Sequence, residues 1–141
     1  MACEVNLDFP GCMDAGALNF DAGANVDDGS CQYLVAFEVD VACLNPVPDQ
    51  VFVAGGFQGW DAAASPMTDE GEGVWRLEVT ITGDTPFEYK FLSSSDWTDA
   101  EEVPELCGTD NGLGGFNRQA TPSSAMASLS TVCFGECVVC D

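Results

Sequence analysis

The chain has no histidine, and its 141 residues include only three basic side chains against 24 acidic ones, for a formal net charge of −21. Nucleic-acid backbones and anionic membrane surfaces are both held by Lys and Arg, so this composition argues against either partner. Without histidine, the chain cannot build a Ser-His-Asp triad or a His-rich metal site. Most hydrolase mechanisms are therefore not expected.

Long hydrophobic runs are missing as well. No stretch of about 18 apolar residues occurs, so no membrane insertion is expected. The start, Met1-Ala2-Cys3, lacks the basic residues and apolar stretch of a signal peptide, which suggests a mature or excised segment. The hydrophobic content of 46% is nevertheless enough to form a core, and an ordered domain is expected.

Cysteine is plentiful, with eight residues at positions 3, 12, 31, 43, 107, 133, 137 and 140. An even number in a short acidic chain predicts disulfides and an extracellular or cell-surface location. Eight cysteines allow about 105 pairings, but Cys12–Cys31 and Cys107–Cys133 would close short loops and are the pairs we predict. The alternative is a zinc site at the last three cysteines, which is less favoured because structural zinc sites use two separated ligand pairs.

Residues 11–33, GCMDAGALNFDAGANVDDGSCQY, have little hydrophobic periodicity and cannot form a core of their own. Side-chain oxygens suited to a cation come from Asp14, Asn19, Asp21, Asn25, Asp27 and Asp28. Calcium takes six to eight oxygen ligands, and an ion together with a disulfide would order the segment. The alternative is a solvated acidic loop, and the spacing is not that of an EF-hand.

The string G-C-M-D-x-x-A-x-N-F-D-x-x-A-x-V-D-D-G-S-C resembles a short repeat of large secreted and cell-surface proteins of Bacteroidetes, typically G-C-T-D-x-x-A-x-N-Y-D-x-x-A-x-x-D-D-G-S-C. The match departs mainly at Met13, where Thr is usual. The acidic positions are more loosely similar to thrombospondin type 3 calcium repeats. The resemblance implies that residues 1–33 are an extracellular spacer module that binds Ca²⁺. The ligands that it implies are Asp14, Asn19, Asp21, Asp27 and Asp28.

Residues 34–134 have the composition and residue pattern of a β-protein. Runs rich in Val, Phe, Thr and aromatic residues predict strands over 34–42, 51–57, 74–82, 87–92 and 127–134. Turn-forming residues separate several of them, at 69–73, 82–86 and 93–96. This spacing predicts an all-β fold, an antiparallel β-sandwich, followed by a Cys-rich tail over 135–141.

The three tryptophans differ in their surroundings. Trp75 alternates with apolar residues on one face of its strand, namely Leu77, Val79 and Ile81, and is expected in the core. Trp60 and Trp97 lie in loops beside Gly, Asp and Ser. Exposed indoles either cover the edge of a sandwich or meet a ligand, and their flat faces suit the apolar face of a pyranose.

Residues from roughly 50 to 120 resemble the starch- and glycogen-binding immunoglobulin-like modules, including the glycogen-binding domain of AMP-activated kinase β subunits. Five motifs recur in order: V-x-V-x-G-x-F-N-x-W, P-[LM]-T, W-x-x-x-[VL], [YF]-x-Y-K-F and a turn ending in Trp. The resemblance implies an immunoglobulin-like sandwich in which Trp60 and Trp97 stack on glucose units. It also implies that Lys90 and a late Asn, Asn117, bond sugar hydroxyls.

Two departures from that family pattern bear on the site. Gln58 replaces the usual Asn of the first motif, and the loop over 98–115 is longer, acidic and carries Cys107. This loop could cover or reshape the sugar groove. It also gathers carboxyl groups at Asp99, Glu101, Glu102 and Glu105, but a glycosidase needs a pocket flanked by two carboxyls, so an enzyme is not expected.

These patterns lead to one functional expectation and two alternatives. We expect a non-catalytic extracellular carbohydrate-binding module whose partner is an α-glucan or another surface glycan. The first alternative is a structural subunit of an extracellular fibre or adhesin, which self-associates through β-strand pairing, calcium and disulfides. The second is a simple spacer within a larger surface protein.

Overall fold

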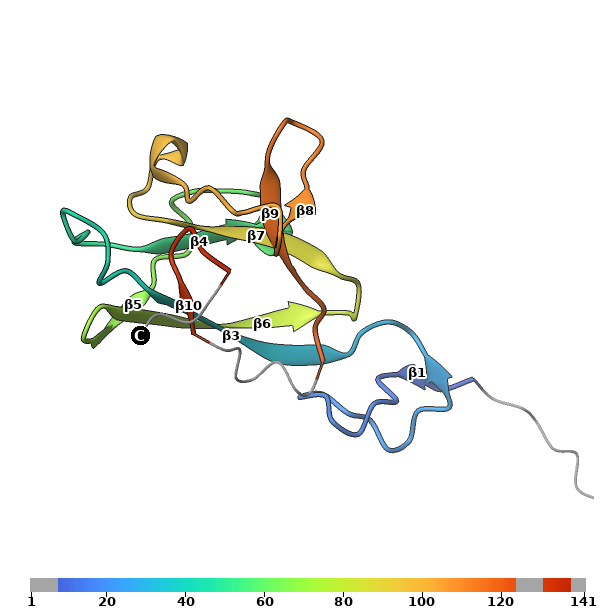
Figure 1. Ribbon diagram of the computed structural model, residues 1–141. Coiled ribbons are helices and arrows are strands. Elements are labelled where there is room, and N and C mark those ends of the chain that lie inside the picture. The colour runs from blue at the N-terminus through green and yellow to red at the C-terminus, as the bar shows by residue number, and fades with distance from the viewer. Residues whose placement is uncertain (1–7, 124–130, 138–141) are drawn as a thin grey trace, which may run out of the picture.

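The computed structural model describes residues 8–123 and 131–137 of the chain. Two four-stranded sheets pack face to face as a β-sandwich, and a small N-terminal module extends from one end (Figure 1). The first sheet has the order β10 (Val132–Cys133), β3 (Gln32–Asp40), β6 (Val74–Thr82) and β5 (Thr68–Gly71). The second has the order β4 (Phe52–Gly55), β7 (Phe87–Leu92), β9 (Phe116–Ala120) and β8 (Thr109–Asp110).

The longest strand pair, β3 with β6, follows directly from the alternation of apolar and polar residues. The two strands are antiparallel and in register from Gln32 opposite Thr82 to Asp40 opposite Val74. Alternate positions point to opposite faces of a sheet, so one set of side chains faces the second sheet and the other faces solvent. On the solvent face, Arg76 forms two ion pairs. Its Nη1 lies 3.4 Å from Glu38 Oε2, and its Nη2 lies 2.9 Å from Glu78 Oε1.

The core lies between the two sheets. Its fully buried aliphatic side chains include Val35, Val39, Val41, Val51 and Val53. An aromatic cluster surrounds Phe37, whose ring centroid is 4.9 Å from that of Tyr89, 5.3 Å from that of Phe57 and 6.1 Å from that of Phe87. Trp75 packs against this core, as its position in the strand pattern predicted.

The predicted all-β sandwich is confirmed, with differences at the short strands. The segment over 69–73, predicted as a turn, also supplies most of β5, and the short polar strands β8 and β9 were not predicted. β10 pairs with β3 in parallel, so the sandwich is not antiparallel throughout. Of the predicted strand over 127–134, residues 127–130 lie outside the described residues. None of the helices in the described part of the chain has the length and apolar character needed to cross a membrane.

The N-terminal module is closed by the predicted Cys12–Cys31 disulfide. It contains one short parallel pair, β1 (Pro10–Gly11) with β2 (Val26–Asp27), and a small buried cluster of Cys12, Ala17, Cys31 and Tyr33. Cys31 directly precedes β3, so the module continues into the sandwich without a linker. A cluster this small cannot order the segment alone, which makes the disulfide its main covalent restraint.

The predicted Cys107–Cys133 disulfide is wrong. Cys107 is bonded to Cys137, with the two Cα atoms 5.6 Å apart, and Cys133 is itself disulfide-bonded. The reason is local: the Glu136 amide donates to the Cys133 carbonyl at 3.0 Å, and this turn carries Cys137 toward the 98–115 loop. Because Cys133 and Cys137 are both oxidised, the last three cysteines cannot together supply thiolate ligands, which rules out the zinc alternative.

The ionisation of the two tyrosines gives a first test of this packing. Burial raises the pKa of Tyr89 to about 12, and the hydrogen bond that the Tyr33 hydroxyl donates to Asp14 raises the pKa of Tyr33 to about 12. In unfolded chains tyrosine titrates near pH 10. We therefore expect the folded protein to show almost no tyrosinate absorbance at pH 10.5.

The same shifts set the direction of the pH dependence of stability. Because both folded-state pKa values are raised, this stabilisation is complete below about pH 10 and is lost as the pH rises toward 12. Absorbance at alkaline pH, followed beside circular dichroism, measures both effects, and Tyr33→Phe isolates Tyr89. A midpoint near pH 10 in protein that is still folded would contradict the burial of Tyr89.

Candidate functional site

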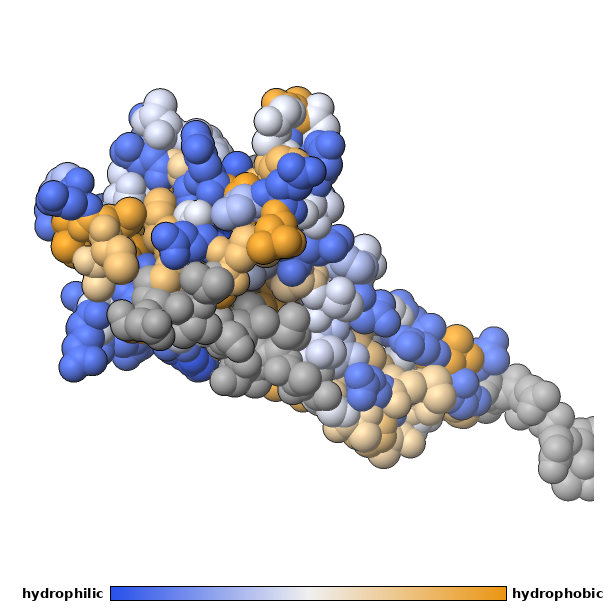
Figure 2. Space-filling model, viewed as in Figure 1, coloured by the Kyte–Doolittle hydropathy of each residue, from blue (hydrophilic) through white to orange (hydrophobic). Residues whose placement is uncertain are grey.

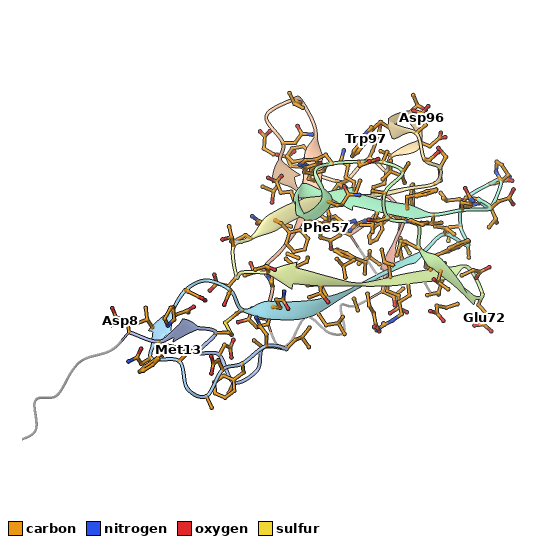
Figure 3. The ribbon with its side chains drawn as sticks, turned by 180° about the vertical axis from the view of Figure 1, so that it is seen from behind. Asp8, Met13, Phe57, Glu72, Asp96 and Trp97 are labelled. Atoms are coloured by element: carbon orange, nitrogen blue, oxygen red, sulfur yellow. A yellow bond between two sulfur atoms is a disulfide. The ribbon has the colours of Figure 1, made fainter. Side chains whose placement is uncertain are left out.

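The outer face of the second sheet carries a groove of about 540 Å³. It brings together all four residues predicted to bind sugar, Trp60, Lys90, Trp97 and Asn117, although they come from four different segments of the chain. The groove is also lined by Glu88, Asn111 and Leu113. The η2 turn that carries Trp97 lies on the same side of the molecule as the η1 turn, where Phe57 is labelled (Figure 3).

The two indoles form the apolar wall of the groove. Their ring centroids lie 6.1 Å apart, and their planes meet at 41°. Trp60 is 37% exposed and Trp97 42% exposed, so neither is covered by the 98–115 loop. The rings therefore present two tilted faces to solvent rather than one flat platform.

Trp60 is held in an uncommon backbone conformation. It follows the 3₁₀ turn η1 (Gly56–Gln58) and has φ of 62°, a left-handed conformation that is unfavourable for a bulky residue. Its amide donates to the Gly55 carbonyl at 2.9 Å. A Cβ at Gly55 would lie 2.4 Å from the Glu88 carbonyl oxygen, so only glycine permits this close approach of the loop to β7.

Gln58 keeps the loop around Trp60 in place. Its Oε1 accepts from the amides of Gly55 at 3.3 Å and Asp61 at 2.7 Å. Its Nε2 donates to the Asp61 carbonyl at 2.6 Å and to Ser65 Oγ at 3.3 Å. Gln at this position, noted above as a departure from the Asn of the family motif, thus uses both ends of its amide to close the loop.

Trp97 begins the second 3₁₀ turn, η2 (Trp97–Asp99). Asp96 caps this turn, because its Oδ1 accepts from the Thr98 amide at 2.9 Å and from the Thr98 hydroxyl at 3.0 Å. These hydrogen bonds from Thr98 hold the pKa of Asp96 below its usual value. The cap therefore stays ionised at neutral pH and fixes the position of the indole.

The floor of the groove is polar. Glu88 and Lys90 point outward from β7, whereas Tyr89 and Phe91 between and beside them point into the core. From the neighbouring strand, Asn117 Nδ2 donates to Glu88 Oε1 at 3.3 Å. The floor thus combines an ammonium, a carboxylate and an amide, which together can donate to and accept from hydroxyl groups.

The 98–115 loop forms one lip of the groove and leaves it open. Asn111 Oδ1 accepts from the amides of Leu113 at 2.8 Å and Gly115 at 3.2 Å, which shapes the tip of the β8–β9 hairpin. At this tip Leu113 is 90% exposed. Figure 2 shows the tip as a hydrophobic spot in largely hydrophilic surroundings.

Three groove residues were not predicted from the sequence. Glu88 could have been found, because it lies two residues before Lys90 in a strand and so shares its face. Asn111 and Leu113 had no such signal, since their approach to the groove depends on a hairpin that closes only in the folded chain. The segment NGLGG indicated a turn but not its direction.

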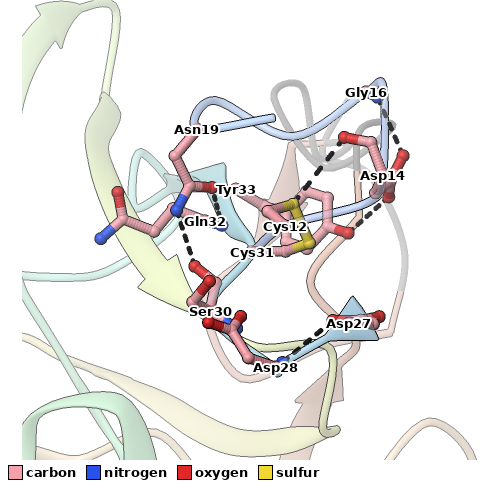
Figure 4. Close-up of a disulfide and its surroundings, with 11 residues drawn as sticks. Cys12, Asp14, Gly16, Asn19, Asp27, Asp28, Ser30, Cys31, Gln32 and Tyr33 are labelled. Atoms are coloured by element: carbon pink, nitrogen blue, oxygen red, sulfur yellow. Dashed lines mark hydrogen bonds between the residues drawn. A yellow bond between two sulfur atoms is a disulfide. The ribbon is translucent and has the colours of Figure 1, made fainter. Parts of the chain in front are cut away.

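The predicted calcium ligands bind backbone amides of their own module. Asp21, Asp27 and Asp28 each accept from the amide two residues further along, at 2.9, 2.9 and 3.0 Å. Asp14 accepts from the Gly16 amide at 2.8 Å and from the hydroxyl of Tyr33 (Figure 4). These hydrogen bonds give the carboxylates a role in turns that needs no ion.

Asn19 bridges two parts of the same module. Its Nδ2 donates to the Ser30 carbonyl at 2.7 Å, and its Oδ1 accepts from the Gln32 amide at 2.7 Å (Figure 4). Within residues 8–123 and 131–137, no three His, Cys, Asp or Glu side chains are placed to hold one metal ion. Calcium binding at these five residues stays a prediction.

The acidic side chains of the 98–115 loop do not form a catalytic pair in the groove. Glu101 is buried and binds Arg118 in two hydrogen bonds, from Nη2 to Oε1 at 2.7 Å and from Nε to Oε2 at 2.8 Å. Asp99 Oδ2 accepts from the Ser94 hydroxyl at 2.8 Å. Among the described residues that line the groove, only Glu88 carries a carboxyl group.

No model of a known protein family matches the chain, and no curated protein matches it either. The resemblance to starch-binding modules therefore remains an interpretation of the motifs.

Proposed function

We propose that the protein is a non-catalytic carbohydrate-binding module that binds a glycan in the groove of the second sheet. The convergence of Trp60, Trp97, Lys90 and Asn117 on one open surface is the observation that carries the proposal. The indoles would stack on the apolar faces of sugar rings, and the polar floor would bond the hydroxyls. Disulfide bonding is consistent with action outside the cell.

The tilt between the two indoles favours a curved glycan. A flat platform suits a straight, ribbon-like chain, whereas planes that meet at 41° suit consecutive sugars that turn relative to one another. α-Linked glucans turn in this way. We therefore propose an α-glucan as the ligand.

The charge of the protein favours a neutral glycan. The groove holds Lys90, but the chain carries a net charge of −21 and would repel uronic-acid or sulfated polysaccharides. Binding of a neutral glucan does not depend on ion pairs, so its affinity should change little with salt. Hydrolysis is not part of the proposal, since glycosidases use two carboxyl groups and the described lining supplies one.

The fibre alternative has less support. Strand pairing between copies needs a long, accessible edge, but β5 spans four residues, has a register shift and is acidic, and β8 spans two residues. Pro66 and Met67 cover the free edge of β4 through a bridge to Phe52 and a 2.8 Å hydrogen bond from the Met67 amide to Val51. These three edges therefore offer little for pairing between copies, whereas on the remaining edge β10 pairs with β3 only at Val39 and Asp40 among the described residues.

Intrinsic tryptophan fluorescence, titrated with soluble α-glucans, tests the proposal. We expect a saturable change in the wild type and a loss of affinity of about tenfold or more in Trp60→Gly and in Trp97→Ala. Glycine is the sharper replacement at position 60, because it removes the indole and also suits the left-handed backbone with φ of 62°. This variant should therefore fold at least as well as the wild type.

Trp75→Phe is the matched control, because Trp75 packs on the core and does not line the groove. It should keep the affinity of the wild type. Static light scattering on the same samples reports self-association. Absence of a saturable change in the wild type, with a mass far above 14.8 kDa, would overturn the proposal in favour of a fibre subunit.

A further inference from the structure

We infer that the glycan-binding surface continues past Trp60 into a second subsite, so that the protein binds a chain internally rather than by its end. This inference rests on the proposed function. A second hollow of about 390 Å³ lies beside the groove, and both hollows are lined by Trp60 and Glu88. Trp60 therefore stands between two binding surfaces and contributes to each.

The lining of the second hollow has the same mixed character as the groove. Phe57 and Phe87 pack edge to face with their ring centroids 5.7 Å apart. Pro86 adds an exposed apolar ring, and the exposed residues Thr82 and Thr85 add hydroxyl groups. Apolar ring surfaces beside hydroxyls and a carboxylate suit a neutral sugar, which has apolar faces and a polar rim.

The residues that the two hollows share indicate which ligand the second hollow binds. Both hollows share Trp60 and Glu88, so a chain that leaves the groove across this indole enters the second hollow. An end-binding site would instead be closed on that side. We therefore assign the second hollow to the continuation of the same neutral α-glucan chain.

Gly56 gives direct control over this subsite. It lines the second hollow but not the groove, and its φ is not in the left-handed region. A Cβ added there meets nothing closer than Trp60 Nε1 at 3.9 Å. Gly56→Leu should therefore fill the hollow without distorting the backbone.

The test compares maltose and longer malto-oligosaccharides, up to maltoheptaose, by isothermal titration calorimetry. In the wild type, affinity should keep rising with length after the groove is filled. Gly56→Leu should reduce affinity for the longest oligosaccharide by about tenfold, the upper range for one stacking contact, and affinity for the shortest by less than about twofold. Thr85→Ala should show a smaller loss with the same length dependence.

Thr80→Leu is the matched control, because it adds the same side chain at an exposed position of β6 in the opposite sheet. It should leave both affinities unchanged. If Gly56→Leu leaves the length dependence of wild-type affinity intact, the second subsite is overturned while the groove stands. If no oligosaccharide of any length binds the wild type, the proposed function fails and this inference fails with it.

Discussion

Arg118→Met is expected to lower the free energy of unfolding by about 3–5 kcal/mol, which makes it one of the two most damaging changes that we predict. Glu101 is 2% exposed and Arg118 6% exposed, and their hydrogen bonds are 2.7 and 2.8 Å long. Removing the guanidinium leaves the Glu101 carboxylate buried without its positive partner. The penalty comes mainly from this uncompensated charge rather than from the lost attraction.

The ion pair joins three parts of the molecule. Glu101 comes from the 98–115 loop and also accepts from the amides of Phe91 at 2.9 Å and Gly135 at 2.8 Å. Arg118 Nη2 donates in addition to the carbonyls of Cys133 at 3.3 Å and Glu136 at 2.9 Å. The pair thus fixes the loop, β9 and the C-terminal turn at one point, and Asn117 of the groove is the neighbour of Arg118 in β9.

Chemical denaturation measured by circular dichroism checks the effect. Arg76→Met is the matched control, because Arg76 lies on the sheet surface beside Glu38 and Glu78 and its loss should change stability by less than about 1 kcal/mol. The double variant Arg118→Met with Glu101→Gln should lose less free energy of unfolding than the two single variants lose together. The reason is that the glutamine at position 101, left without the guanidinium, carries no charge. If Arg118→Met and Arg76→Met lose the same free energy of unfolding, the buried ion pair does not have the stabilising role proposed here.

The strands that the sequence pattern predicted are those whose apolar residues mark a buried face. The bounds of β6 and β7 agree with the prediction, and β3 differs by two residues at each end. β9 reads FNRQA, and its buried positions include Asn117 and Arg118. A polar residue can be buried only if a partner meets it, and these partners are Glu88 and Glu101, far along the chain.

The same distinction separates the predicted and the missed parts of the site. Trp60 and Trp97 stood out because indoles in Gly- and Ser-rich loops lack a nearby strand pattern to bury them. The convergence of the four predicted side chains, however, depends on strand order, which places β7 between β4 and β9. The disulfide of Cys107 was mispredicted for a related reason, because a single turn after Cys133 decides which cysteine reaches the loop.

The double variant Cys12→Ser with Cys31→Ser is expected to unfold the N-terminal module while the sandwich remains folded. The bridge spans 19 residues, and native disulfides in small domains typically contribute about 2–5 kcal/mol. The module buries only four residues in its own cluster, and two of them are the bridged cysteines. Its remaining order comes from the short β1–β2 pair, a few backbone hydrogen bonds and exposed hydrogen bonds of Asp and Asn side chains, which contribute little when water competes.

Limited proteolysis, analysed by mass spectrometry, measures this loss of order. Cleavage within residues 13–30 should become fast in the variant and remain slow in the wild type, while fluorescence and glycan affinity stay unchanged because Trp60, Trp75 and Trp97 all lie in the sandwich. Cys107→Ser with Cys137→Ser is the matched control, since its bridge lies at the other disulfide. Slow cleavage of the module in the Cys12→Ser, Cys31→Ser variant would contradict this prediction, because it would show that hydrogen bonds keep the module folded without the disulfide.

Calcium can be tested on the same variant, which lacks only the Cys12–Cys31 disulfide. If Asp14, Asn19, Asp21, Asp27 and Asp28 bind an ion, millimolar calcium should restore resistance to cleavage, and chelation should sensitise the wild type. Binding would require several carboxylates to exchange their amide partners, two residues along the chain, for the ion. Magnesium is the control, since it demands smaller, more regular coordination. If resistance to cleavage is the same with calcium, magnesium or chelator, calcium does not order the module. Its order then comes from the turns and the disulfide alone.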